Sequence, residues 1–234
     1  MKNQENKTLE NETENKTLKY DDIPPEIPVV MDPGLAYGAE PDYYNFMSVG
    51  DKTLEDYLAL PEGSRIEMID GRFYNMASPT SLHTLLGAEL YSAFKNLIKK
   101  NGGPCVPLLA PIDVCLDANG KTMVQPDVFI VCDQKKEIYP FVKGAPDLIV
   151  EIVSPSNRAM DVMKKRYKYQ KAGVREYWMV FPEEKRIEVC SFENDTDIVY
   201  TFEDQIPIGI WENQCSIDLQ KLYESVRFLL DRKA

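Results

Sequence analysis

The sequence predicts an α/β protein in which a central mixed β-sheet is flanked by helices. Two short, largely apolar runs, at 127–131 and 148–153, are typical of central strands that are buried on both faces. A basic helical segment and another β-prone run follow the second of them, which is the order of a crossover between parallel strands. With 234 residues, 44% of them hydrophobic, the chain is long enough for one globular core.

The N-terminal residues differ in composition from the rest of the chain. Residues 1–20 are mainly Asn, Glu, Lys and Thr, too polar to offset the entropy lost on ordering, and five prolines interrupt residues 21–44. We therefore expect a disordered or extended acidic segment at 1–46 and one domain at 47–234. The N-terminus lacks the apolar stretch of a secretory signal, and no run could span a membrane, so we expect a cytoplasmic protein.

The domain is expected to begin with a short helix and a hairpin. Thr53 is a suitable N-cap for a helical pattern at 54–60. Asp70-Gly71 separates two β-prone runs, at 65–69 and 72–76, and this dipeptide tolerates the positive φ angles of a two-residue turn.

A long helix is expected next, since capping residues at 78–81 precede an apolar stripe with helical spacing that reaches Lys100.

The Tyr177-Trp178 pair is interpreted as part of the core, with stacking on nucleic-acid bases as the alternative. The remaining expected elements are strands at 106–116, 127–131 and 148–153, a basic helix at 157–172 that closes at Gly173, strands at 176–180, 187–192 and 198–202, and a docking helix at 217–230.

The cysteine and charge patterns exclude several classes of protein. The five cysteines are scattered and never form a C-x-x-C pair, which argues against a disulfide framework and a structural zinc site, so we expect reduced thiols. The net charge of −11 opposes non-specific binding to nucleic acid, although residues 158–175 hold seven basic residues and one acid. The sequence contains no P-loop, nucleophile-elbow or dinucleotide-binding motif.

Two acids occupy positions where strands should be buried. Asp127 opens one apolar run, and Glu151 lies inside another with apolar neighbours on its own face. A buried carboxylate must be paired, protonated or bound to a cation. Two of them on neighbouring strands would suit Mg²⁺ or Mn²⁺; the alternative is an acid at a sheet edge or in a salt bridge with a nearby base.

Lysines on the following helix are the third element of this hypothesis. Lys164 and Lys165 could stabilise developing phosphoryl charge or help to position an attacking water near a metal. The alternative is that Asp161 and Lys165, which are four residues apart, form an ordinary pair on the helix surface.

A family resemblance is carried by residues spread over about 50–220. They are Arg65 to Gly71, His83, Gln125-Pro126-Asp127-Val128, Gly144 to Ser156, Asp161, Lys165, Tyr169, Ala172-Gly173-Val174 and Glu176-Tyr177-Trp178. Together they resemble the Uma family of putative restriction endonucleases in the PD-(D/E)XK nuclease superfamily. The resemblance implies a restriction-endonuclease-like core and Mg²⁺-dependent or Mn²⁺-dependent hydrolysis of phosphodiester bonds in nucleic acid, with DNA as the expected substrate.

The resemblance also assigns residues. It implies a metal ion held by Asp127 and Glu151, with Glu67 as an extra ligand or water-positioning acid. The standard motif places a lysine two residues after the second acid, where this sequence has Val153; Lys165 matches the family's lysine instead.

Further candidates surround this set. His83, the only histidine, could move protons or contact phosphate, or it could simply be a partly exposed residue at a helix start. Asp113 could hold the metal-binding acids in place without contacting the metal itself. We expect the basic helix to contact the nucleic-acid backbone through Arg158, Lys164 and Lys168.

The alternative function is a catalytically inactive nuclease-fold module for binding or assembly. The acidic net charge and Val153 at the usual lysine position both favour it. A homodimer is expected under either hypothesis, because symmetric dimers are the commonest soluble oligomers.

Overall fold

The structure is a computed structural model that describes residues 49–155 and 158–231, all of them within one compact unit. The segment expected to be disordered, 1–46, lies outside the described residues. A large sheet has the strand order β11-β10-β9-β8-β6-β3. Its strands in chain order are β3 (Val106–Leu109), β6 (Val128–Val131), β8 (Leu148–Ile152), β9 (Glu176–Phe181), β10 (Arg186–Ser191) and β11 (Thr196–Thr201).

A small sheet and a two-stranded ribbon complete the β-structure. The small sheet has the order β2-β1-β5-β4-β7. Its strands are β1 (Ile66–Ile69), β2 (Arg72–Asn75), β4 (Val114–Cys115), β5 (Met123–Val124) and β7 (Val142–Lys143), and the ribbon pairs β12 (Gln205–Pro207) with β13 (Ser216–Asp218). The helices are α2 (Leu54–Leu58), α3 (Ser81–Asn101), the π-helix η2 (Met160–Lys165), α4 (Arg166–Ala172), the 3₁₀-helix η3 (Gly209–Trp211) and α5 (Leu219–Leu230).

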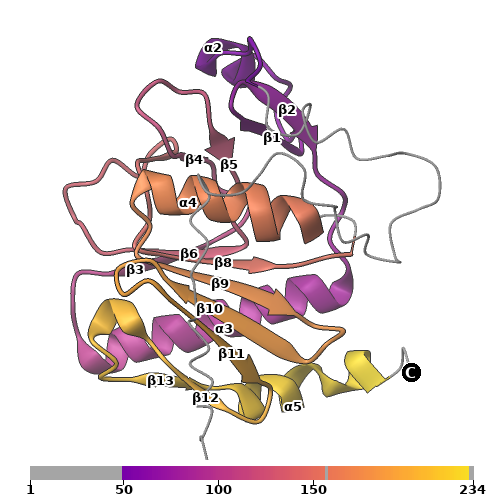
Figure 1. Cartoon of the computed structure of the whole chain (residues 1–234), viewed down its shortest axis with the longest axis vertical. Helices are drawn as coiled ribbons and strands as arrows, with labels where there is room; N and C mark the ends of the chain where they lie inside the picture. The colour runs from indigo at the N-terminus through magenta and orange to yellow at the C-terminus, as the bar shows by residue number, and fades with distance from the viewer. Residues whose placement is uncertain (1–48, 156–157, 232–234) are drawn as a thin grey trace, which may run out of the picture. The chain divides into compact units, whose positions relative to one another are not determined.

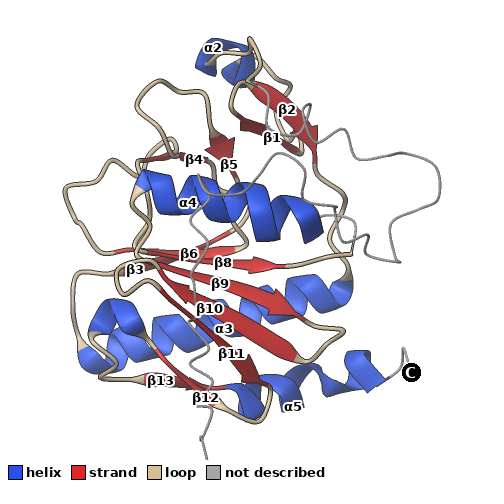
Figure 2. Cartoon of the chain, viewed as in Figure 1, coloured by secondary structure: helices blue, strands red, loops and turns tan. Residues whose placement is uncertain are grey.

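The large sheet is covered on both faces (Figures 1 and 2). On one face, α3 and α5 share a core with β6 and β8, to which Leu90 and Val150 belong. On the other face, α4 and the small sheet form a second core that includes Tyr169 and Ile149. Because successive side chains of a strand point to opposite faces, the neighbours Ile149 and Val150 serve different cores. The α/β architecture predicted from the sequence is thereby confirmed.

Local sequence signals account for the first elements. Thr53 caps α2 in a reciprocal capping box with Asp56, as its position before the helical pattern predicts. Asp70 and Gly71 turn the β1–β2 hairpin with φ angles of 52° and 70°. Thr80 caps α3 by accepting a hydrogen bond from the backbone N–H of His83.

The prediction of one strand over 106–116 is wrong, because the chain changes sheets within it. β3 pairs with β6 in the large sheet, whereas β4 pairs with β5 and β7 in the small sheet. Pro111 lies between them and has no N–H to donate to a ladder, which favours a break there. β5 and β7 were not predicted, since two residues are too few to show an alternating pattern.

The crossover from β8 to β9 is confirmed, and it contains an unpredicted feature. β8 and β9 are parallel neighbours, with Glu151 opposite Met179. Within the described residues, the basic helix runs from Arg158 to Ala172, but its first part is the π-helix η2. Gly173 ends it in the left-handed region with φ 94°, as expected for a helix-terminating glycine.

The expectation that the cysteines are reduced is wrong for two of them. Cys105 and Cys132 form a disulfide. They follow the register of the β3–β6 ladder, in which Val106 lies opposite Val131, so the fold places them face to face on neighbouring strands. The other three are free thiols: Cys115 and Cys190 are buried and Cys215 is half-buried.

Two further expectations concern buried aromatic residues and membrane segments. Tyr177 and Trp178 are fully buried, which confirms their interpretation as core residues. Among the described helices, none combines the length and apolar character needed to cross a bilayer.

Candidate functional site

Asp127 and Glu151 lie close together at one end of the β6–β8 ladder. The last pair of this antiparallel ladder is Val128 opposite Val150, so Asp127 immediately precedes β6 where Glu151 continues β8. Oδ2 of Asp127 also accepts a hydrogen bond of 2.7 Å from the backbone N–H of Ile152. The two strand acids that the sequence singled out therefore lie together.

Glu151 is buried, with a relative exposure of 4%, and its Oε1 atom is hydrogen-bonded twice. The Nζ atom of Lys165 lies 3.1 Å from it, and the hydroxyl of Tyr169 donates a hydrogen bond of 2.6 Å. Burial raises the pKa of the Glu151 carboxyl well above its usual range; Lys165 opposes this rise, and the neighbouring carboxylate of Asp127 adds to it. Negative charge thus exceeds positive charge around Glu151.

Lys165 lies among three carboxylates that we call the lysine cage: Glu67, Glu151 and Asp161. Its Nζ atom is 3.0 Å from Glu67, 3.1 Å from Glu151 and 3.5 Å from Asp161. Burial alone would lower the pKa of this ammonium group, but the three carboxylates raise it well above its usual range, so the lysine stays charged. The alternative of an ordinary surface pair between Asp161 and Lys165 is wrong, because both side chains are buried.

Glu67 lies on β1, and a hydrogen bond from a neighbouring backbone N–H holds its carboxylate in the lysine cage. Its Oε1 accepts a hydrogen bond of 2.8 Å from the backbone N–H of Gln125, and its Oε2 faces Lys165. The Gln125 side chain donates in turn to Asp113, at 2.9 Å, and the Tyr57 hydroxyl donates to the same oxygen at 2.7 Å. Asp113 therefore lies one residue behind Glu67, in the supporting place that the sequence suggested.

His83 lies beside Asp127 rather than in the lysine cage. Its Nε2 atom is 3.1 Å from Oδ2 of Asp127, and the two side chains keep 25% and 14% of their exposure. The first turn of α3 thus brings the only histidine to the open side of the carboxylate pair, where exchange of protons with solvent is possible.

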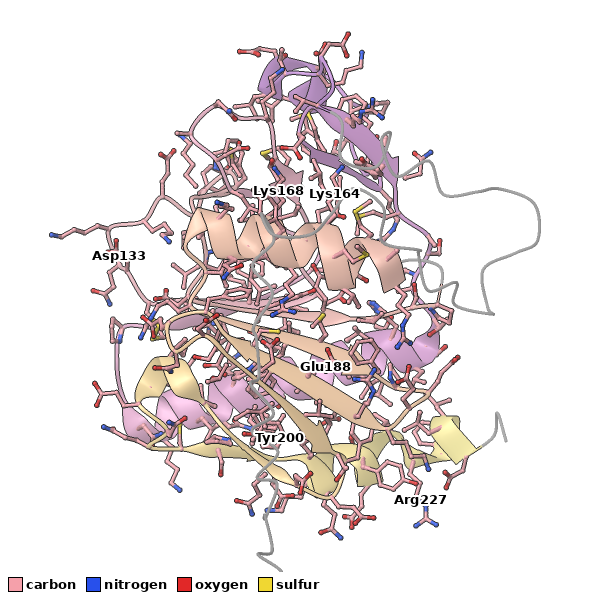
Figure 3. The ribbon with its side chains drawn as sticks, viewed as in Figure 1. Asp133, Lys164, Lys168, Glu188, Tyr200 and Arg227 are labelled. Carbon is pink, nitrogen blue, oxygen red and sulfur yellow. A yellow bond between two sulfur atoms is a disulfide. The ribbon has the colours of Figure 1, made fainter. Side chains whose placement is uncertain are left out.

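The basic residues of the helix, which are expected to contact the nucleic-acid backbone, differ in their exposure. Figure 3 shows Lys164 and Lys168 on the side of the helix that faces the small sheet. Lys164 is only 3% exposed and donates to the Tyr74 hydroxyl at 2.7 Å, so its prediction as an exposed phosphate contact is wrong. Lys168 pairs with Asp70, and the half-exposed Arg158 pairs with Glu184.

Sequence reasoning gave no role to Asp161 beyond a surface pair and none to Tyr169. A signal for both was present: residues 161, 165 and 169 are spaced four apart, which places them on one side of a helix. Gln125 could not be found in this way, because its contact with Glu67 joins segments 58 residues apart through a backbone N–H.

The oxygen donors fit a hard divalent cation at Asp127 and Glu151. Within residues 49–155 and 158–231, no three or more His, Cys, Asp and Glu side chains form a ready-made metal cluster. Mg²⁺ does not require one, since it is usually bound by one or two carboxylates and completes its shell with water and substrate phosphate. Within those described residues, the contacts of Asp127 with Ile152 and His83 use its Oδ2 atom, and the contacts of Glu151 with Lys165 and Tyr169 use its Oε1 atom. The second oxygen of each carboxylate is then available to a cation.

The chain is similar to proteins of a known family. The family model Uma2, described as "putative restriction endonuclease", matches residues 54–208. An uncharacterized protein of Synechocystis sp. is 29% identical over 109 residues, which are 46% of this chain and 56% of that relative. The match thus spans little more than half of the relative's length.

A solved structure is similar over most of the chain. The crystal structure of a putative nuclease belonging to DUF820 from Anabaena variabilis has a TM-score of 0.64 and 21% sequence identity, and the match covers 75% of this chain and 99% of that one. At this identity the likeness establishes a shared fold.

Proposed function

Because the chain belongs to the Uma2 family of putative restriction endonucleases, we propose that it hydrolyses phosphodiester bonds of nucleic acid with the help of a divalent metal ion. DNA is the proposed substrate. One observation carries the proposal: Oδ2 of Asp127 accepts a hydrogen bond from the backbone N–H of Ile152, which brings this carboxylate next to Glu151 on β8.

Asp127 and Glu151 are the proposed metal ligands. Bound there, Mg²⁺ or Mn²⁺ would polarise a phosphoryl oxygen and generate a hydroxide-like nucleophile near neutral pH. We do not include Glu67, which the sequence suggested as a third ligand, because Gln125 and Lys165 already engage its two oxygens.

Lys165 and Tyr169 are proposed to position Glu151. Both contact the same oxygen, Oε1, and together they fix the orientation of the carboxylate. Burial and the nearby Glu151 raise the pKa of Tyr169, so that its hydroxyl remains a hydrogen-bond donor at neutral pH. In this role Lys165 acts through Glu151 and does not touch the scissile phosphate.

His83 is the proposed proton-transfer group. Its imidazole is partly exposed and lies 3.1 Å from Asp127, so it can collect a proton from solvent and deliver it to a leaving oxygen near the carboxylate pair. Arg158 and Lys168 remain proposed contacts to backbone phosphates, because neither is fully buried. Binding through them should weaken steeply as the salt concentration rises.

The test combines metal binding with cleavage. Calorimetric titration of Mn²⁺ and a plasmid-cleavage assay are run on the wild type, on Asp127→Asn and Glu151→Gln, and on the exposed control Glu62→Gln. We expect the wild type and the control to bind Mn²⁺ and to cleave, and both site variants to lose cleavage while keeping their circular dichroism spectrum. Unchanged cleavage by Glu151→Gln would refute the proposal.

The second candidate is the inactive nuclease-fold module. The observation that favours it is that no group of three or more potential ligands is preassembled in the described residues. It predicts salt-sensitive DNA binding without Mn²⁺ uptake and without cleavage under any metal. Mn²⁺ binding that Asp127→Asn abolishes would decide against it.

A further inference from the structure

The lysine cage has the construction of a cation site. Its carboxylates come from three separate elements, Glu67 from β1, Glu151 from β8 and Asp161 from η2. They converge on one nitrogen at 3.0, 3.1 and 3.5 Å. Several carboxylate oxygens around one positive centre are also the surroundings that hard divalent ions take in proteins.

The cage is closed to solvent. The side chains of Lys165, Glu67 and Asp161 retain only 4–6% of their exposure. Water therefore cannot screen the three carboxylates, and the ammonium group of Lys165 lies within 3.5 Å of all three of them. The three carboxylates need a cation, and the chain supplies one of its own.

Glu151 joins the cage to the proposed metal position. Its Oε1 belongs to the cage, and Asp127 is hydrogen-bonded to the backbone N–H of the next residue, Ile152. Sites that use two metal ions place them about 3.5–4 Å apart. Here the Nζ atom of Lys165 lies 3.1 Å from Glu151, next to the proposed metal position.

Building on the function proposed above, we propose that the ammonium group of Lys165 is the resident cation of a second cation position, so that the site takes a single divalent ion. Glu67 and Asp161 then hold the lysine, not the metal. The second position carries one positive charge in place of two, and this charge cannot leave the protein when the metal is removed.

The proposal is tested by counting bound Mn²⁺ in calorimetric titrations of the full chain. Lys165→Ala removes the ammonium group and leaves space for a hydrated ion among the three carboxylates. The matched control is Lys164→Ala, which truncates the neighbouring buried lysine, whose reported hydrogen bond goes to Tyr74. We expect Lys165→Ala to bind one Mn²⁺ more than the wild type, and Lys164→Ala to bind the same number as the wild type.

The number of Mn²⁺ ions bound by the wild type and by Lys165→Ala tests this proposal and the proposed function independently. One ion in the wild type and two in Lys165→Ala support both. No ion in the wild type and one in the variant supports the cage and removes the metal from the proposed function. Equal counts in the wild type and Lys165→Ala overturn the cage as a cation position.

Two further measurements keep the proposal testable if Lys165→Ala is unstable. The variant should regain its circular dichroism spectrum on addition of millimolar Mn²⁺, and a variant that stays unfolded counts against the cage. Glu67→Gln retains the lysine and should bind Mn²⁺ like the wild type, because Glu67 serves Lys165. A smaller number of bound Mn²⁺ ions in Glu67→Gln than in the wild type would make Glu67 a ligand and overturn the proposal.

Discussion

At the scale of single residues, the buried acids around Lys165 connect stability to pH. Burial, with the nearby charges of Glu67 and Asp127, raises the pKa of Asp161 to about 6, from 3.8 for a free side chain, against the opposing effect of Lys165. The folded protein thus holds this proton more tightly than the unfolded chain. The contribution of Asp161 to stability is therefore fully present below about pH 4 and is lost as the pH rises through about 6.

Asp161→Asn should remove this dependence of stability on pH, because asparagine cannot ionise. As the pH rises from 4 to 7, the free energy of unfolding of the variant should increase relative to that of the wild type, by about 3 kcal/mol at most. Urea denaturation at both pH values measures the change. The exposed variant Asp51→Asn should show a difference from the wild type that does not depend on pH, and the same flat behaviour in Asp161→Asn would contradict the prediction.

Lys165→Met is expected to be strongly destabilising at neutral pH. The substitution keeps the volume of the side chain but leaves the three cage carboxylates without their cation, which costs roughly 3–5 kcal/mol in buried ion pairs. Chemical denaturation at pH 7 measures the loss, which should shrink at pH 4, because the raised pKa values of Glu151 and Asp161 favour the neutral form of both carboxyl groups there. The exposed control Lys171→Met should change stability by less than about 0.5 kcal/mol; a similarly small effect of Lys165→Met would show that the cage contributes little.

The sequence revealed only part of the site, for identifiable reasons. Asp127 and Glu151 could be found because an acid inside an apolar strand is conspicuous and neighbouring strands bring such acids together. Glu67 came from the family resemblance alone, since its strand is amphipathic and could accommodate an acid on the solvent side. The lysine cage could not be predicted, because it joins residues as far apart as Glu67 and Lys165 through the packing of the small sheet.

At the scale of elements, the sequence predicted those with a strong local signal. α3 has capping residues, an apolar stripe and a terminating glycine, and β8 is a continuous apolar run; both are found where expected. The two-residue strands β5 and β7 have no such pattern. The π-helix η2 was also missed, because helical periodicity does not distinguish one hydrogen-bonding pattern from another over six residues.

Gly173 provides a prediction at this scale. It ends α4 with φ 94°, and a Cβ atom there would meet no other atom within 4 Å, so backbone strain alone determines the effect of a substitution. Gly173→Ala should destabilise the protein by about 1 kcal/mol. Gly173→Asn should cost less, because asparagine tolerates the left-handed region. Thermal unfolding compares the two; equal costs would point to a cause other than strain.

At the scale of the whole molecule, the disulfide links the end of the edge strand β3 to the end of its neighbour β6. Titration of thiols in denaturant without reductant should therefore detect Cys115, Cys190 and Cys215 only, and all five cysteines should react after reduction. The bridged residues are 27 positions apart, for which loop-closure entropy gives about 3.5 kcal/mol of stabilisation. Five reactive thiols before reduction would contradict the pairing.

The alternation of β8 between two cores limits how this protein can vary in length. Leu148, Val150 and Ile152 face α3, while Ile149 and Val153 face the small sheet and α4 together with Glu151. Deleting one residue within the strand would exchange the two sets. The carboxylate would then point into the apolar core beneath α3, with the composition of the strand almost unchanged. In related sequences we therefore expect insertions and deletions near the site to fall in the connecting loops, where a shift of one position does not change the direction of a side chain.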